Sequence, residues 1–269
     1  MPCSPSALSS EKTVSALANL SVIIIAKNES KSLEDCLRSV AWAAERIVLD
    51  GGSSDDTVAI AQRLGARVEM AADWPGFGPQ KNRVLSYASA PWVLSLDADE
   101  RVTPDLAAEI QRLIVSADAR PWYRMPRSSS YCGRTLRRGG WWPDYVTRLF
   151  RRGAARFSQD QVHERLIPEV GQGAMPLGTL QHPLLHATYS TLEEVLDKAN
   201  RYSSLGARQD FAKGRRAGLA QALGHGAWAF FRTYVLRGGL LEGGHGFLLA
   251  VSNAHTTFYR YAKLWLLRQ

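Results

Sequence analysis

Two aspartates one residue apart follow an apolar segment that is typical of a buried strand. Residues 92–101, WVLSLDADER, place Asp97 and Asp99 at the end of that segment and Glu100 directly after them. Carboxylates this close repel one another unless a cation lies between them. The pattern indicates either a divalent metal site that bridges the phosphates of a nucleotide, for which oxygen ligands favour magnesium or manganese, or an acidic turn leading into a helix.

Further polar residues follow other apolar segments. Asp50 precedes GGSSDDT and is able to accept hydrogen bonds from a base or ribose, while a Gly-Ser turn that caps a helix is the structural alternative. Asn28 and Glu29 follow the first apolar segment and would bracket the same nucleoside. Lys81 and Arg83 begin a later helix, where they either face solvent or neutralise a diphosphate.

Alternating strands and helices position these residues. Apolar segments rich in β-branched residues end near positions 26, 50, 70 and 97, and a segment with helical features follows each of them. Thr103 and Pro104 are typical of the N-cap and first position of a helix, and further helices are predicted over residues 80–88 and 191–209. The pattern predicts an α/β fold with an open, mostly parallel sheet, helices on both faces and a ligand-binding edge at the carboxyl ends of the strands.

The composition is that of a folded chain. Of 269 residues, 45% are hydrophobic and 22% are charged, which argues against extensive disorder. Residues 1–18 are small and polar, so a disordered tail is predicted rather than a signal peptide. Three scattered cysteines, Cys3, Cys36 and Cys132, favour a reduced, cytoplasmic setting over a disulfide framework or a zinc site. No apolar stretch is long enough to predict a membrane-spanning helix.

Most of the net charge of +8 lies in residues 212–269. This segment contains eight lysines and arginines against one acid, Glu242, and many aromatic residues lie between them. Basic and aromatic residues on short amphipathic helices are typical of an anchor on an anionic membrane surface, and nucleic-acid binding uses the same residue types. A helical subdomain packed on the sheet is the structural alternative.

The ordered motifs together resemble glycosyltransferase family 2, inverting enzymes of the GT-A fold that use nucleotide-diphosphate sugars. The resemblance covers residues 20–202 and rests on the segments SVIIIAKNES, IVLDGGSSDDT, GPQKNRVLSYASAPWVLSLDADERVTPDL, RLFRR and QVHERL. Within the family, the middle and C-terminal segments are most similar to the bacterial lipopolysaccharide inner-core enzymes that add glucose to the first heptose (WaaE/KdtX type).

The resemblance implies a role for each matching residue. Asp97 and Asp99 would form a DxD motif that binds a divalent metal, manganese or magnesium, with Asp99 as a direct ligand. His186 would complete the metal site from a later loop, and His182 is a weaker candidate. The nucleotide-binding residues implied by the family pattern are Ala26, Asn28, Glu29, Asp50, Ser53, Lys81, Arg83, Asp97 and Ala98.

An inverting transfer needs a base that removes the proton of the acceptor hydroxyl. The family pattern places Glu164 in this role, with Asp144 and Asp160 as alternatives, and a structural salt bridge is the alternative role of Glu164. Arg148 would stabilise charge on the leaving diphosphate. Trp141 and Trp142 either stack on a sugar face or pack in the core.

We interpret the chain as a metal-dependent inverting glycosyltransferase, peripheral on the cytoplasmic face of the bacterial inner membrane. The expected reaction moves a hexose, glucose from UDP-glucose, to the heptose of the lipopolysaccharide inner core. Alternatives are transfer to polyprenyl phosphate or another glycolipid, and a non-catalytic membrane-surface binding protein. A lipid-linked acceptor favours an anionic membrane over nucleic acid as partner, and the oligomeric state stays open. The expected organisation is a tail (1–18), a GT-A domain (19–210) and a basic amphipathic helical membrane-associating segment (211–269).

Overall fold

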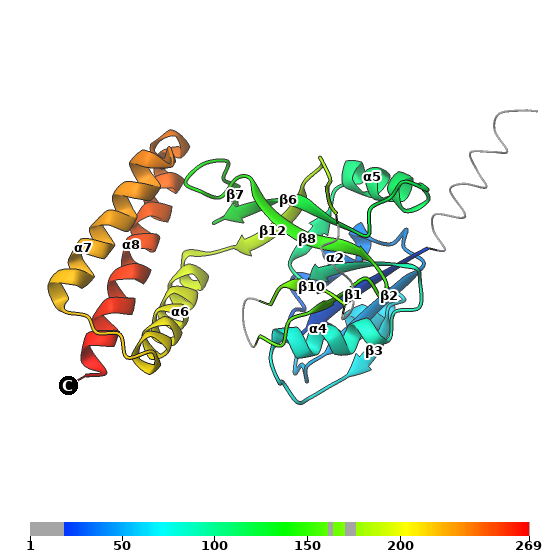
Figure 1. The fold of residues 1–269 in the computed structure, drawn as a ribbon, viewed down its shortest axis with the longest axis horizontal. Coiled ribbons are helices and arrows are strands. Elements are labelled where there is room, and N and C mark those ends of the chain that lie inside the picture. Colours follow the sequence, from blue (N-terminus) through cyan, green and yellow to red (C-terminus); the bar gives the residue numbers. More distant parts are fainter. Residues whose placement is uncertain (1–18, 161–163, 170–175, 269) are drawn as a thin grey trace, which may run out of the picture. The chain divides into compact units, whose positions relative to one another are not determined.

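The computed structural model describes residues 19–160, 164–169 and 176–268 (Figure 1). The predicted tail, residues 1–18, lies outside the described residues, as does His163 of the motif QVHERL. The chain divides into two compact units. The first consists of Met1–Arg127 and Tyr145–Leu185, and the second of Ser128–Asp144 and His186–Gln269.

Four parallel strands form the centre of the first unit: β1 (Leu20–Ala26), β2 (Glu45–Asp50), β3 (Arg67–Met70) and β4 (Trp92–Asp97). The sheet order is β3-β2-β1-β4-β8-β6-β12-β5, and β8 (Asp144–Arg151) pairs with β4 in the antiparallel direction. The register sets Ala26 opposite Asp50, and Ile25 opposite Asp97. Parallel strands end at one edge, so the ends of β1, β2 and β4 bring their polar residues together.

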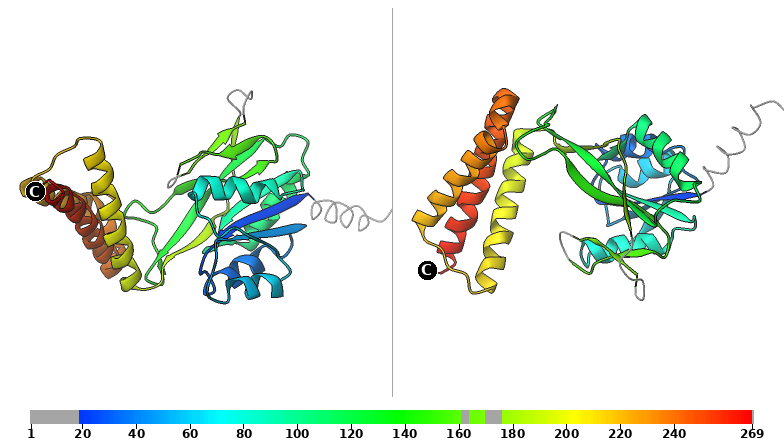
Figure 2. Two further views of the ribbon diagram at one scale, coloured as in Figure 1. Left: turned by 90° about the horizontal axis from the view of Figure 1, so that it is seen from below. Right: turned by 45° about the horizontal axis from the view of Figure 1, so that its top comes forward.

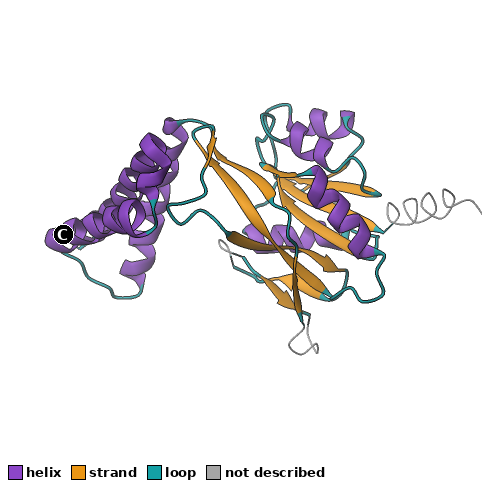
Figure 3. Cartoon of the chain, turned by 90° about the horizontal axis from the view of Figure 1, so that it is seen from above, coloured by secondary structure: helices purple, strands orange, loops and turns teal. Residues whose placement is uncertain are grey.

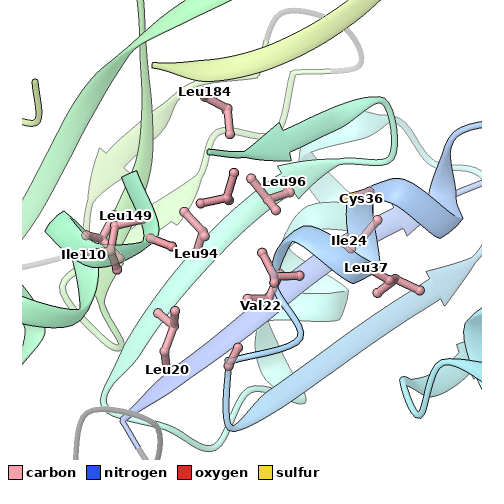
Figure 4. Close-up of a cluster of buried hydrophobic side chains, with 14 of the residues drawn as sticks. Leu20, Val22, Ile24, Cys36, Leu37, Leu94, Leu96, Ile110, Leu149 and Leu184 are labelled. Atoms are coloured by element: carbon pink, nitrogen blue, oxygen red, sulfur yellow. The ribbon is translucent and has the colours of Figure 1, made fainter. Parts of the chain in front are cut away.

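Helices cover both faces of these strands, as Figure 3 shows. Val22 and Ile24 of β1 point to one face, where they pack in a buried cluster with residues of α2 (Leu33–Ser39), α3 (Thr57–Arg63) and α5 (Pro104–Ile114) (Figure 4). Ile23 and Ile25 point to the other face and pack with α4 (Phe77–Ser86). Side chains alternate along a strand, so the uninterrupted apolar run of β1 fills two cores.

The predicted fold class is confirmed, including the start of α5. The Thr103 side chain accepts a hydrogen bond from the Leu106 amide, and Pro104 is the first helical residue. The middle of the chain adds short strands rather than loops alone. These strands are β5 (Glu100–Val102), β6 (Trp122–Tyr131), β7 (Arg134–Thr135), β9 (Ala155–Phe157), β10 (Leu166–Pro168), β11 (Leu177–Thr179) and β12 (Leu184–Tyr189).

Helix α4 forms hydrogen bonds with Phe157, the last residue of β9, and with Asp160. The Asn82 amide donates to the Phe157 carbonyl and accepts from the Phe157 amide, both at 2.8 Å. Gly78 donates its backbone N–H to the Asp160 carbonyl at 3.2 Å, and a Cβ at Gly78 would lie 1.9 Å from the Ser158 carbonyl oxygen. Only glycine permits this approach, which brings residues 158–160 against α4.

The second unit contains three long helices, which lie side by side in Figure 2. They are α6 (Leu192–Ala212), α7 (Leu219–Phe231) and α8 (Gly243–Leu266), with the short turns η1 (Arg232–Leu236) and η2 (Gly239–Glu242) between α7 and α8. Among the described residues, no helix combines the length and apolarity that crossing a bilayer requires.

The helical extension predicted for the C-terminal segment is confirmed, with two differences. The helix predicted over residues 191–209 as part of the GT-A domain corresponds to α6, which packs with α8. Asp210 of α6 forms an ion pair with Arg260 of α8 at 2.7 Å. Short amphipathic helices were expected in this segment, whereas α8 is 24 residues long. Gly243 and Gly244 lie at the start of this helix, where glycine costs little.

Candidate active site

The ends of β1 and β2 are joined by hydrogen bonds between the polar residues predicted to face a nucleoside. Asp50 is fully buried, and its Oδ1 accepts the backbone N–H groups of Gly52 at 2.9 Å and Ser53 at 2.8 Å. Asn28 has a left-handed backbone, with φ of 58°. Its backbone N–H donates to Ser53 Oγ at 2.8 Å, and its side-chain Oδ1 accepts from the backbone N–H of Ser54 at 2.8 Å. This network fixes the loop after β2 against the end of β1.

The acidic residues of GGSSDDT extend the same network. Asp56 is the N-cap residue of α3, but its side chain makes no capping hydrogen bond. Asp55 instead accepts hydrogen bonds from the Thr57 hydroxyl and the Ser30 amide, which hold the pKa of its carboxyl well below the usual range. Thr57 Oγ1 in turn accepts the Glu29 amide at 2.8 Å.

An exposed aromatic pair lies beside this loop and was not singled out in the sequence. A Cβ at Gly51 would lie 3.3 Å from the Trp74 ring, and Trp74 meets Phe77 edge to face with centroids 5.2 Å apart. Both rings are exposed by about two fifths. Both rings lie in ADWPGFGPQ, where two aromatic residues beside a proline and two glycines were the available signal.

A buried lysine joins Asp97 to Glu164. Lys81 Nζ lies 2.8 Å from Asp97 Oδ1 and 2.6 Å from Glu164 Oε1, and the lysine side chain is 2% exposed. Asp97 is the last residue of β4, Lys81 belongs to α4, and Glu164 precedes β10. The structure therefore brings the first aspartate of the DxD motif and the expected base onto one ammonium group.

Arg148 of β8 compensates the same aspartate from the other side. Its Nη2 pairs with Asp97 Oδ2 and, at 2.6 Å, with Glu100 Oε1. Glu100 is fully buried, its Oε2 accepts the Asp97 amide at 3.0 Å, and Arg127 lies 3.5 Å from its Oε1. Glu100 thus orients both Asp97 and Arg148.

The two cations set the ionisation of this cluster. Burial alone would raise the pKa of Asp97, but the charges of Arg148 and Lys81 outweigh it and hold that pKa far below its usual range. Burial would likewise lower the pKa of Arg148, and the carboxylates of Asp97 and Glu100 raise it instead. Arg148 Nε is a buried donor without a hydrogen-bond partner among the described residues.

The predicted metal ligands do not form a preformed cluster in the part of the chain that the structure describes. Each oxygen of Asp97 already contacts a cation, so this carboxylate does not fit direct coordination in the observed arrangement. Asp99 lies in the two-residue turn between β4 and β5, and its carboxylate chemistry fits magnesium or manganese. Ala98, in the same turn, is buried.

His186 belongs to the second unit. Its Nδ1 lies 3.1 Å from Ser129 Oγ and 2.9 Å from Thr188 Oγ1, so its metal role stays a prediction. His182 belongs to the first unit and is paired with Glu109 at 2.8 Å. Burial opposes ionisation of Glu109, but hydrogen bonds from the backbone of residue 181 and from His182 lower its pKa.

The remaining predicted residues lie apart from the lysine bridge. Arg83 makes two 2.8 Å hydrogen bonds to Asp73 at the surface, and these bonds lower the pKa of Asp73. Asp160 accepts a hydrogen bond from the Ser158 hydroxyl at 2.7 Å. Asp144 is the first residue of β8 and belongs to the second unit, whereas the rest of β8 belongs to the first. Of the three carboxylates considered for the base, Glu164 is the one that contacts Lys81.

Trp141 packs within the second unit. It meets Tyr131 edge to face at 5.7 Å and borders a cavity of about 140 Å³. The other lining residues are Tyr131, Tyr189, Val195, Ala199, Tyr202, Leu249, Ser252, Asn253 and Thr256. Packing thus explains the position of Trp141, and stacking on a sugar stays a prediction.

Comparison with known proteins identifies the family. The sequence profile described as "Glycosyl transferase family 2" matches residues 21–153. The lipopolysaccharide core biosynthesis glycosyltransferase LpsC of Rhizobium meliloti is 32% identical over 256 residues, which cover 91% of this chain and 92% of that protein. An uncharacterized glycosyltransferase of Rickettsia bellii is 28% identical, with 91% and 85% covered.

Solved structures give weaker matches. S. aureus TarS in complex with UDP-GlcNAc is 16% identical with a TM-score of 0.43, and the match covers 68% of this chain and 66% of that one. Glucosyl-3-phosphoglycerate synthase of Mycobacterium tuberculosis, in complex with Mn²⁺, UDP and its product, is 24% identical with a TM-score of 0.36. That match covers 48% of this chain and 50% of the other, so this chain spans about half to two thirds of the solved chains. The likeness to LpsC over nearly the whole chain, together with the profile match, shows that this protein is a glycosyltransferase of family 2.

Proposed function

We propose that this enzyme transfers glucose from UDP-glucose, with inversion, to the heptose of the lipopolysaccharide inner core at the cytoplasmic face of the inner membrane. The observation that carries the proposal is the Lys81 bridge, which sets Glu164 beside the DxD carboxylate Asp97. The name of the LpsC relative supports lipopolysaccharide core as the acceptor class.

The donor would bind along the carboxyl edge of β1, β2 and β4. Asp50 and Asn28 would contact the nucleoside, since both lie in the loop network at this edge. Trp74, exposed beside Gly51, offers a ring on which a flat base can stack.

A divalent cation, manganese or magnesium, would be held by Asp99 and would neutralise charge on the departing diphosphate. Asp97 would contribute by keeping Lys81 and Arg148 in place rather than as a ligand, because both its oxygens contact these cations. Arg148 Nε, which lacks a partner among the described residues, would supply one more donor for a phosphate oxygen after local movement.

The transfer would proceed as one displacement. The acceptor hydroxyl oxygen forms a bond to C1 of the sugar while the bond from C1 to the diphosphate oxygen breaks, and Glu164 accepts the hydroxyl proton. Glu164 Oε1 is occupied by Lys81, so Oε2 would be the oxygen that takes this proton. Positioning by Lys81 and charge stabilisation by Arg148 and the cation would supply most of the acceleration.

The test is a transfer assay with UDP-glucose, Mn²⁺ and a heptose-containing inner-core acceptor. Glu164→Gln should retain donor binding in a thermal-shift assay and lose about 10²- to 10⁴-fold in transfer rate, as expected for loss of a general base. Asp144→Asn and Asp160→Asn are the matched variants, and neither should lose comparable activity. Full activity in Glu164→Gln, or its loss in Asp160→Asn alone, would reassign the base.

The same assay distinguishes the alternative acceptors. Transfer to polyprenyl phosphate in place of the heptose acceptor would retain the enzyme class and overturn the acceptor. Absence of metal-dependent turnover with every nucleotide sugar and acceptor tested would favour a membrane-surface binding protein without catalytic function.

A further inference from the structure

The hairpin formed by α7, the two turns and the first part of α8 carries almost no charge, and the two cations nearer the end of α8, Arg260 and Lys263, contact Asp210 and Asn200 of α6. Between Ala217 and Tyr259 the charged residues, histidines aside, are Arg232, Arg237 and Glu242. Glu242 is buried, whereas both arginines are exposed. A helix pair in contact with water normally presents charged and polar side chains on its outer face.

This hairpin has its large apolar side chains on the outside. The buried residues of α7 are small: Ala222, Gly226 and Ala229. A Cβ at Gly226 would lie 3.2 Å from Phe258 Cβ of α8, so small residues allow the two helices to approach closely. Helix packing through small residues spaced by three or four, with large apolar residues facing outward, is typical of helices in contact with lipid.

We call six exposed apolar residues on α7 and its following turns the hairpin surface. They are Leu223, Trp228, Phe231, Leu236, Leu240 and Leu241. Three of them, Leu223, Leu236 and Leu241, are each at least 60% exposed. Several exposed leucines and aromatic residues gathered on one hairpin are typical of an interaction surface.

Arginines from a distant part of the sequence border the turn. Gly139 donates its backbone N–H to the Arg237 carbonyl at 2.8 Å, which brings the loop after β7 beside the turn between α7 and α8, as Figures 1 and 2 show. Exposed Arg137 and Arg138 lie in this loop, and exposed Arg134 lies in β7 directly before it. The arginines of the loop and of η1 therefore lie at the same end of the helical unit.

The single acid of the hairpin is used internally. Glu242 accepts the Arg137 amide at 3.0 Å and pairs with Arg134 at 3.7 Å. The exposed charge around the hairpin surface is consequently positive. A second copy of this chain would place like charges against each other, whereas anionic lipid headgroups complement them.

We propose that the hairpin surface inserts into the headgroup region of an anionic phospholipid bilayer, with Arg232, Arg237 and the arginines of residues 134–138 at the headgroups. Interfacial insertion needs an apolar face flanked by basic residues and needs no spanning helix. The use of this contact, to meet a lipid-linked acceptor, rests on the proposed function, but the lipid binding does not. The proposed membrane contact also includes residues 134–138, which lie outside the predicted C-terminal membrane-associating segment.

The test is flotation of the full chain with vesicles of phosphatidylcholine alone or with 30% phosphatidylglycerol, without nucleotide sugar. Anionic vesicles should bind at least tenfold more tightly than neutral ones, because each arginine near the surface contributes about fivefold. Leu236→Ser combined with Leu241→Ser should abolish flotation, and Arg232→Gln combined with Arg237→Gln should weaken it at least tenfold. Met70→Ser combined with Leu177→Ser, at exposed apolar positions of the first unit, is the matched control and should float as wild type.

Quenching of tryptophan fluorescence tests insertion with a variant that still binds the vesicles. Brominated lipids should quench the tryptophan fluorescence of the wild type, and Trp228→Phe should remove most of that quenching while flotation persists. Unchanged flotation of the leucine variant, or quenching that survives Trp228→Phe, would overturn the proposal. It would also be overturned if wild type were a dimer by light scattering and the leucine variant a monomer that floats normally. Lipid binding without sugar transfer would refute the proposed function alone.

Discussion

The Lys81 bridge predicts a large and pH-dependent loss of stability in Lys81→Met. The lysine side chain is 2% exposed and Glu164 is 15% exposed, so the substitution leaves a nearly buried carboxylate without its cation. Removal of one partner of a buried ion pair costs about 3 to 5 kcal/mol in free energy of unfolding. Asp97 keeps Arg148 and is 34% exposed, so we expect the lower end, about 3 kcal/mol. The midpoint of thermal unfolding should fall by about 6 to 12 °C.

The pH dependence follows from the lowered pKa of Asp97. A carboxyl with a lowered pKa in the folded state stabilises the fold above its unfolded pKa, and this contribution is lost as pH falls through the folded pKa. Without Lys81 the folded pKa of Asp97 rises. The difference between wild type and variant should therefore be complete at pH 7 and shrink as the pH is lowered below about 4.

The assay is urea unfolding followed by circular dichroism between pH 7 and pH 3. Arg83→Met is the matched control, because Arg83 lies on the same helix and pairs with Asp73 at the exposed surface. Solvent screens that pair, so the control should stay close to wild type at every pH. Equal stability of the two variants, or a difference that does not depend on pH, would refute the account of the buried bridge.

Two further substitutions test how the bridge is held. Gly78→Ala places a Cβ 1.9 Å from the Ser158 carbonyl oxygen, so residues 158–160 must shift. A lower midpoint of thermal unfolding and slower sugar transfer are expected. Wild-type values of both would show that α4 does not require glycine at position 78. Glu100→Gln removes the fully buried charge that pairs with Arg148, and it should lower the free energy of unfolding in urea by about 3 kcal/mol. A loss below about 1 kcal/mol would mean that Asp97 alone compensates the charge of Arg148.

Local patterns made parts of the fold predictable. The alternation of apolar strands and helices led to the parallel centre of the sheet, and the Thr103-Pro104 pair led to the start of α5. The placement of Asp50 and Asp97 at strand ends followed from the same pattern, because parallel strands share one carboxyl edge. These signals lie within a few residues of the feature that they predict.

The ion pairs of the site depend on contacts between distant residues. Lys81 and Glu164 are separated by 83 positions, and nothing near either residue indicates that they meet. Glu100 stands before a helix, where acids are common, and only its burial beside Arg148 reveals the ion pair. The assignment of α6 likewise required the packing of α6 against α8.

The central claim is a transfer with inversion in which Glu164 acts as the base. The most direct measurement is the anomeric configuration of the new linkage, determined by proton NMR on product formed from UDP-α-glucose and the heptose acceptor. The account predicts a β-linked product from the wild type and its disappearance in Glu164→Gln with donor binding intact. An α-linked product would require two displacements or a different reaction course and would contradict the proposed mechanism.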